Sequence, residues 1–448
     1  MKRVLSGTGF ILFVPGGILV TVLEALPFFY LAHRLPVDQV VAHQLAPFTS
    51  FLNASSESLS GYTSTGLSVT LFESSLPAVL QWWRSFLQWV GGIGIVVFIS
   101  ALHPGIASVS AHYSSTNRSE SEEDKQQDEQ EENDDQEEVL PNTEVSWAKI
   151  WWIYLGFTFL AIGLLWAQDI PLWEAINHGM TAISTGGFSI TDQSLQHYAW
   201  GPKLSVILII ILGSLNFHAF HQLFTKGAGQ QFIRNQQHQL FFVLLLVGTF
   251  LVFYENNVWA NGSVSWTDLA FQFSSALGTC GFSTVVVQDW SVPALLVLTA
   301  AMLVGGATAS TTGGVKLFRV ILLVRGNLYG VLSWMKDPDR ELNLRFNHRV
   351  FSHDESLRLY RNMGVFFFFW IGTFVLTTVV LLHEVPSQYG LADVVFEAAS
   401  ALGTTGLSTG ITSHELSALG KLDLMLAMLV GRLELMPLVI ILAKVMRH

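Results

Sequence analysis

A five-residue pattern occurs four times in this chain, and the repetition constrains the fold more than any other feature. The pattern is Ser or Thr, any residue, Gly, Leu or Phe, then Ser, at 64–68, 185–189, 279–283 and 404–408. A hydroxyl residue lies six positions before each glycine: Ser60, Thr181, Ser275 and Ser400. A polar residue lies thirteen positions before it: Asn53, Glu174, Asp268 and Asp393. Agreement at several offsets indicates four diverged copies of one structural unit.

The composition predicts an all-α polytopic membrane protein. Half of the 448 residues are hydrophobic and only 13% are charged, whereas soluble proteins average about 25% charged. Many apolar stretches approach or exceed the roughly 18 to 20 residues that cross a bilayer. The single cysteine, Cys280, excludes an intrachain disulfide and a multi-cysteine metal site.

The net charge of −11 comes from one segment, because residues 119–138 hold twelve acidic residues and one lysine. Such low-complexity charge normally remains solvated and disordered. We therefore expect a cytoplasmic linker there, with a calcium site or a basic partner as the alternative interpretation.

Each copy of the motif follows a helix that is too short to cross the membrane and lies between two longer apolar stretches. We expect four helix–pore-loop–helix repeats in a pseudo-fourfold array around a central pore, with eight spans in total. The expected divisions are repeat one 1–105, acidic linker 106–147, repeat two 148–232, repeat three 233–345 and repeat four 346–448. Lys and Arg are concentrated in the loops on one side, which predicts that both termini are cytoplasmic and that the motifs open outward.

The motifs carry the chemistry of a cation pore. Non-helical backbone persists inside a bilayer only where it is buried in protein or lines a cavity. Glycine permits positive φ, so that carbonyl groups can turn inward, and a ring of carbonyl oxygens can replace the hydration shell of a cation. The hydroxyls six positions before each glycine are expected to support this backbone. The predicted ion-binding residues are Ser64, Thr65, Gly66, Thr185, Gly186, Gly187, Thr279, Cys280, Gly281, Thr404, Thr405 and Gly406.

The apolar stretch 288–325 is too long for one crossing and is interrupted by small polar residues. Glycine and threonine at membrane depth predict a flexible gate loop below the filter, and a kinked helix is the alternative. The apolar flanks exclude a phosphate-binding loop, which needs a soluble strand and helix. The predicted gate residues are Gly305, Gly306, Thr308, Ser310, Thr311, Thr312, Gly313 and Gly314.

Arg432 is a charged residue inside an apolar stretch, and such residues are functional candidates. Two hypotheses remain open. Arg432 either lies beside the pore and repels cations, or it forms a structural ion pair with Glu434 or another acid or extends to the inner interface. His218 and His221 share a helix face by spacing, but a metal site needs more ligands, so a packed polar helix end is favoured.

The four motifs, the break at 305–314 and Gly-Arg-Leu-Glu at 431–434 resemble the Trk/Ktr potassium uptake superfamily, specifically its ion-translocating membrane subunit of the bacterial TrkH-like branch. The resemblance covers nearly the whole chain. It implies that carbonyl groups at Gly66, Gly187, Gly281 and Gly406 select potassium, and that Gly66 rather than serine favours potassium over sodium. It also implies that 305–314 is an intramembrane gate and that Arg432 faces the pore.

The resemblance further implies a homodimer surrounded by lipid in the bacterial inner membrane. A cytoplasmic TrkA-like regulatory subunit would bind the nucleotide, NAD or ATP/ADP, and potassium would be the substrate, with no covalent cofactor, no nucleic acid and no enzymatic activity. Many members have an extra pair of N-terminal helices that this sequence does not match, which leaves the branch of the superfamily open. The acidic insert 119–138 is unusual for the family, which leaves its role open.

Two alternative functions are weighed against potassium uptake. A sodium-permeable or poorly selective transporter of the same fold would use the same motifs, since each has one pivotal glycine. A membrane-embedded hydrolase would need a nucleophile and a base at one site, and the fourfold repetition of hydroxyls disfavours a unique nucleophile.

Overall fold

The computed structural model describes residues 21–34, 43–94, 147–227, 229–336, 341–347 and 349–433. These residues are predominantly helical, and their one sheet is a pair of two-residue antiparallel strands, β1 (Arg345–Phe346) and β2 (Arg349–Val350). The all-α prediction is therefore confirmed. The predicted acidic segment 119–138 lies outside the described residues.

The first unit contains two helices that flank a short buried one. Residues 21–34 and 78–94 are helical, as are 43–45. Between them lie the 3-10 helices η1 (Ala46–Thr49) and η2 (Glu73–Ser75) and the short helix α3 (Phe51–Tyr62). Most of α3 is buried although many of its residues are polar.

The second unit repeats this plan but its last span is bent. Its helices are α6 (Trp147–Trp166), α7 (Leu172–Ile183), α8 (Trp200–Ser214) and α9 (Phe217–Lys226). The sequence predicts one span over 203–224, whereas α8 and α9 meet at 92°. The bend has a local cause, because the Asn216 side chain accepts hydrogen bonds from the first N–H groups of α9 and begins a new helix there.

The third and fourth units complete the chain. The third contains α10 (Gly229–Arg234), α11 (Gln236–Phe253), a π-helical turn (Tyr254–Trp259), α12 (Trp266–Leu277), α13 (Val292–Val304) and α14 (Leu317–Lys336). The fourth contains α15 (His353–Glu384), α16 (Leu391–Leu402) and α17 (Ala418–Arg432). Residues 305–316, between α13 and α14, are non-helical, so the predicted interruption is a loop and the alternative of a kinked helix is wrong.

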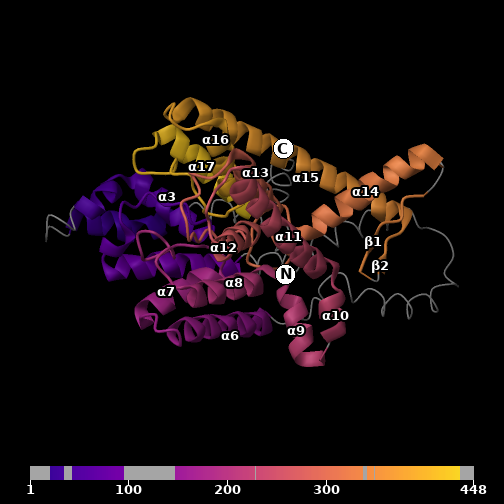
Figure 1. Cartoon of the computed structure of the whole chain (residues 1–448), viewed down its shortest axis with the longest axis horizontal. Coiled ribbons are helices and arrows are strands. Elements are labelled where there is room, and N and C mark those ends of the chain that lie inside the picture. Colours follow the sequence, from indigo (N-terminus) through magenta and orange to yellow (C-terminus); the bar gives the residue numbers. More distant parts are fainter. Residues whose placement is uncertain are drawn as a thin grey trace, which may run out of the picture.

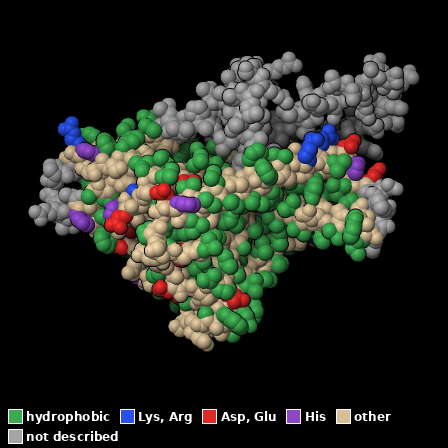
Figure 2. Space-filling view, turned by 90° about the horizontal axis from the view of Figure 1, so that it is seen from above, with side chains coloured by type: hydrophobic (Ala, Val, Ile, Leu, Met, Phe, Trp, Pro, Cys, Tyr) green, Lys and Arg blue, Asp and Glu red, His purple; other side chains and the backbone are tan. Residues whose placement is uncertain are grey.

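Four helices in the described residues are long and apolar enough to cross a membrane, and a fifth span is obtained if the bent pair counts as one. The sequence also predicts spans over 7–31, 81–102 and 419–444, and these fall partly outside the described residues. Hydrophobic side chains cover much of the face in Figure 2. Exposed apolar side chains on long helices are what a lipid environment accommodates, and the protein is a multi-pass membrane protein.

The short helices occupy the interior. In Figure 1, α12 lies near the middle of the molecule, α3 and α16 lie above it in this view, and α7 lies below it. α13 packs against α16, α12 against α8, and α17 against α3, so that outer helices of one unit contact short helices of the next. This packing brings the ends of all four short helices together.

Candidate functional site: a ring of four glycine loops

The four motifs begin at the same distance from their short helices. Each short helix has 12 residues and ends four residues before the motif glycine. The loop that follows is anchored by the same backbone hydrogen bond in all four repeats, from the residue before the glycine to the residue six before the glycine. These N···O distances are 2.9 Å for Thr65–Ser60, 2.9 Å for Gly186–Thr181, 2.8 Å for Cys280–Ser275 and 2.8 Å for Thr405–Ser400.

The loops also share an unusual backbone conformation. The residue two before each glycine has a positive φ, a region that residues with a side chain rarely occupy. The φ values are 51° at Ser64, 51° at Thr185, 45° at Thr279 and 48° at Thr404. The motif glycines have φ values of 94° at Gly66, 73° at Gly187, 87° at Gly281 and 92° at Gly406. Strained backbone of this kind persists where surrounding structure holds it and concentrates at functional sites.

The glycines contact one another in a closed ring. A Cβ atom on any of them would lie within 2.2 Å of a carbonyl oxygen in the next repeat. The contacts run from Gly66 to Gly186, from Gly187 to Cys280, from Gly281 to Thr405 and from Gly406 to Thr65. The fourth repeat therefore contacts the first, and glycine is required because any side chain would overlap the neighbouring backbone.

The hydroxyls six before each glycine mostly support the loops, as predicted. Ser60 Oγ accepts a hydrogen bond from Gly66 N at 3.0 Å, and Ser400 Oγ accepts one from Gly406 N at 2.9 Å. Ser275 Oγ donates to the Phe282 carbonyl at 2.7 Å. Thr181 differs, because its hydroxyl donates to the Asn177 carbonyl within α7.

A second set of supporting residues, not predicted from the sequence, lies nine residues before each glycine. Every member is polar, fully buried and hydrogen-bonded to the serine that ends the motif. The side-chain distances are 2.9 Å for Glu57–Ser68, 3.0 Å for His178–Ser189, 2.9 Å for Gln272–Ser283 and 2.8 Å for Glu397–Ser408. Alignment of the four copies at this offset would have revealed the pattern, and the contact explains why each motif ends in serine.

Arg84 adds a buried charge to this layer. Its side chain is 1% exposed and its Nε lies 2.7 Å from Glu57 Oε1. Its Nη1 donates to the carbonyl oxygen of Ser189 in the second repeat at 2.9 Å, and its guanidinium lies 4.2 Å from the centre of the Phe188 ring. The ion pair of repeat one thereby holds the loop of repeat two.

The loop 305–314 and Arg432 contact the layer formed by the residues with positive φ. The four residues that lie two positions before a motif glycine each contact either this loop or Arg432. Gly313 N donates to Thr279 Oγ1 at 2.7 Å, and the Thr185 and Thr311 hydroxyls are 3.2 Å apart. A Cβ on Gly313 would lie 2.1 Å from Thr404 Oγ1. Arg432 Nη2 lies 3.4 Å from Ser64 Oγ.

The rest of this loop is tied to surrounding backbone. Gly305 and Gly314 have φ values of 72° and 73°, and a Cβ on Gly305 would lie 2.2 Å from the Gly313 carbonyl. Thr311 Oγ1 is 3.0 Å from the carbonyl oxygens of Ile183 and Gly213. Further side-chain bonds join Thr312 Oγ1 to Gly306 N, Thr308 Oγ1 to Gln237 Oε1, and Ser310 Oγ to Thr312 Oγ1.

Arg432 joins this loop to the first repeat. It is the last residue of α17 and is 6% exposed. Its Nη1 donates to the Thr311 carbonyl at 2.8 Å and its Nη2 donates to the Gly91 carbonyl at 2.7 Å. Its guanidinium is thus held by backbone carbonyl groups beside the ring, while Glu434 lies outside the described residues.

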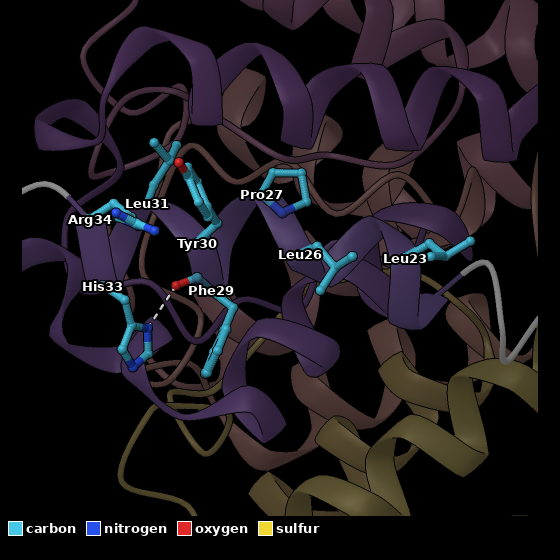
Figure 3. Close-up of a pocket in the computed structure, with 8 residues that line it drawn as sticks. All are labelled: Leu23, Leu26, Pro27, Phe29, Tyr30, Leu31, His33 and Arg34. Carbon is cyan, nitrogen blue, oxygen red and sulfur yellow. Dashed lines mark hydrogen bonds between the residues drawn. The ribbon is translucent and has the colours of Figure 1, made fainter.

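Two other features lie apart from the ring. His218 and His221 are on α9, and the described residues contain no group of three or more potential metal ligands. The groove in Figure 3 is formed by the helix 21–34 and contains none of the predicted site residues. Its lining residues are Leu23, Leu26, Pro27, Phe29, Tyr30, Leu31, His33 and Arg34.

The fold and the ring together define a polytopic membrane protein in which four repeated loops converge at one buried site. A sequence model of the TrkH family, described as a cation transport protein, matches residues 33–448. The chain belongs to this family.

Similar proteins carry related names. The chain is 29% identical over 404 residues to the Trk system potassium uptake protein TrkI of Halomonas elongata, covering 89% of this chain and 78% of that protein. It is 28% identical over 396 residues to an uncharacterized cation transporter of Methanocaldococcus jannaschii, covering 88% and 77%. The crystal structure of the potassium transporter TrkH from Vibrio parahaemolyticus has the same fold, with a TM-score of 0.78, 21% identity, and coverage of 97% of this chain and 84% of that one.

Proposed function

We propose that this chain is the ion-translocating subunit of a potassium uptake system in the bacterial inner membrane, with the four glycine loops as its selectivity filter. The observation that carries the proposal is the closed ring, in which each motif glycine contacts the backbone of the next repeat. Carbonyl groups in such a ring can replace the hydration shell of a cation. The names of relatives such as TrkI support potassium as that cation.

The loop 305–314 and Arg432 would form the barrier. They contact the same layer of the four loops, and Arg432 brings a positive charge to it. Opening would require Arg432 to leave the Thr311 and Gly91 carbonyl groups. Such a change fits regulation by a cytoplasmic nucleotide-binding subunit, and a homodimer is the proposed assembly.

Growth of a potassium-uptake-deficient bacterium at low potassium tests the transport function. Cells that express the chain with a Trk regulatory subunit are expected to grow and to accumulate rubidium. A matched control is Gly281→Val, because its side chain would overlap the Thr405 carbonyl, and this variant should give no uptake. Absence of uptake by wild-type protein present in the membrane would contradict the proposal.

A sodium-permeable transporter remains the second candidate, since the ring has one pivotal glycine per repeat. Flux measurements in vesicles that contain purified protein distinguish the two. A potassium transporter should be blocked poorly by excess external sodium, whereas equal fluxes of the two ions would favour the second candidate.

A further inference from the structure

The ring has four similar loops, but the contact between repeats one and two contains an additional side chain. Gln88 lies on the helix 78–94 of repeat one and is fully buried. Its Nε2 donates to the carbonyl oxygen of Gly186 at 2.6 Å, and its Oε1 accepts from Phe188 N at 2.9 Å. One side chain of repeat one therefore holds the backbone on both sides of Gly187.

We call the carbonyl oxygens of the four residues that precede the motif glycines the ring oxygens. The contact with Gln88 gives one of these four oxygens a hydrogen bond that the other three lack. The Gly186 carbonyl corresponds to those of Thr65, Cys280 and Thr405, and each of the four lies against the glycine of a neighbouring repeat. Among the described residues, only the Gly186 oxygen of these four accepts a side-chain hydrogen bond. Its position is consequently fixed by a group outside the loop.

The sequence of repeat two matches this arrangement. The position before the ring glycine is Thr65, Cys280 or Thr405 in the other repeats but Gly186 here. Gly186 does not have a positive φ, so its backbone conformation does not require glycine. A Cβ there would lie 2.4 Å from Gln88 Cδ. Glycine at this position therefore makes room for Gln88.

Arg84 strengthens the same contact from one turn earlier on the helix. It donates to the Ser189 carbonyl at 2.9 Å. Together, Arg84 and Gln88 hold repeat two at residues 186, 188 and 189, so this part of the ring has little freedom to close around a smaller ion.

We propose that Gln88 is a specificity-determining positioning residue of the ring. By holding back the Gly186 oxygen it keeps the ring at a size that suits potassium and prevents this oxygen from following the smaller sodium ion. A filter that discriminates by cavity size depends on such restraint. The inference rests on the proposed function of the ring as a potassium filter.

The first test compares potassium and sodium uptake by wild type and Gln88→Met, which keeps the length of the side chain but removes both hydrogen bonds. The loss of a buried hydrogen bond of this kind should lower the potassium-to-sodium uptake ratio about tenfold, mainly through increased sodium uptake. Gln81→Met is the matched control, because Gln81 is a buried glutamine on the same helix that contacts Trp173 and the backbone of Glu73 but no motif residue. It should leave the ratio unchanged.

The second test uses the steric relation between the two residues. Gly186→Ala should displace Gln88 and lower the ratio as Gln88→Ala does. The double variant should be no worse than either single variant, because residues in one contact have non-additive effects. If the decreases in the potassium-to-sodium uptake ratio were additive in the double variant, the proposal would be overturned. These alanine variants test the role of Gln88 even if Gln88→Met does not accumulate in the membrane.

The two proposals fail differently. Wild-type protein without potassium uptake would contradict the proposed function. Potassium-selective wild-type protein whose ratio is unaltered by Gln88→Met and by Gly186→Ala would contradict only the role of Gln88.

Discussion

Repeats one and four place a glutamate at the same position of their short helices, α3 and α16, but its carboxylate has different partners in each. Glu57 and Glu397 are both fully buried and both accept a hydrogen bond from the serine that ends their motif. Glu57 also pairs with Arg84 at 2.7 Å. Each glutamate also accepts from the backbone N–H after that serine, Val69 N at 2.9 Å for Glu57 and Thr409 N at 3.1 Å for Glu397. In place of an arginine, Glu397 accepts from Thr412 N at 3.0 Å in its own loop.

The difference shows how one repeat can acquire a structural role that its copy lacks. Glu397 stabilises only the loop that follows α16. Glu57 holds its own loop through Ser68 and Val69 and also fixes an arginine that reaches repeat two. A buried carboxylate that depends on a distant partner is therefore more sensitive to substitution than one satisfied locally.

The largest expected effect comes from breaking the Glu57 pair. Glu57→Gln would remove the close partner of the buried Arg84 charge and leave only Glu73, whose Oε1 lies 4.0 Å from the Arg84 guanidinium. Removing one member of a buried ion pair costs about 3–5 kcal/mol of unfolding free energy, and the remaining Glu73 places the expected loss near the lower value. Glu397→Gln introduces the residue that repeat three carries at this position, and should cost only about 1–2 kcal/mol because most hydrogen bonds persist. Thermal unfolding of the purified variants in detergent measures both.

The double variant Glu57→Gln with Arg84→Met is the control for this difference. Removal of both charges should recover much of the loss, since the buried arginine charge is removed together with its close partner and Glu73 is partly exposed. Equal losses for Glu57→Gln and Glu397→Gln would show that Arg84 does not distinguish the two repeats.

Arg432 joins repeat four to repeat one, because it lies on α17 and its guanidinium contacts Gly91 and Ser64. Arg432→Ala should raise rubidium flux about tenfold, a change of about 1.4 kcal/mol in the barrier, because the positive charge beside the ring is removed. Arg432→Lys should retain low flux. A folded but inactive Arg432→Ala protein would instead indicate a structural role.

The ring glycines of the two repeats should also differ. Gly66→Ser would push against Gly186, which Gln88 holds, whereas Gly406→Ser would push against Thr65. Both variants should lower the preference for potassium over sodium, by a few-fold, with the larger effect at Gly66 because its neighbour yields less. Competition of sodium with rubidium uptake measures the change, and an unchanged preference in both would remove these glycines from the filter.

The smallest expected effect is at the contact between repeats two and three, where Lys203 Nζ lies 2.8 Å from Asp268 Oδ1. Burial raises the pKa of Asp268, but hydrogen bonds from Lys203 and Ser265 outweigh it and bring the pKa below its usual value. The lowered pKa stabilises the folded protein above the unfolded-state pKa of about 4, and this contribution is lost as the pH falls through the folded-state pKa.

Asp268→Asn should therefore cost no more than about 1 kcal/mol at pH 7, because the pair is partly exposed and screened. The difference from wild type should shrink below about pH 4. Thermal unfolding at the two pH values tests this, and a difference that grows in acid would contradict the assignment.

The sequence by itself determined the local features of this protein. The four motifs, the short helices and the hydroxyls at Ser60, Ser275 and Ser400 depend on contacts within a few residues, so that each copy specifies them separately. The same reasoning, extended to Glu57 and its three counterparts, would have identified the supports of the motif serines.

Only the tertiary structure decided how the copies are joined. The order of contacts around the ring and the contact of Arg432 with Gly91 both involve residues that are distant in sequence. Gly186 lacks a side chain, and Gln88 of the neighbouring repeat fills the space that a side chain there would need. This relation becomes apparent only when the two repeats are placed together. The repeated sequence motif therefore predicts four loops of the same local conformation. The packing between repeats gives individual loops different side-chain contacts.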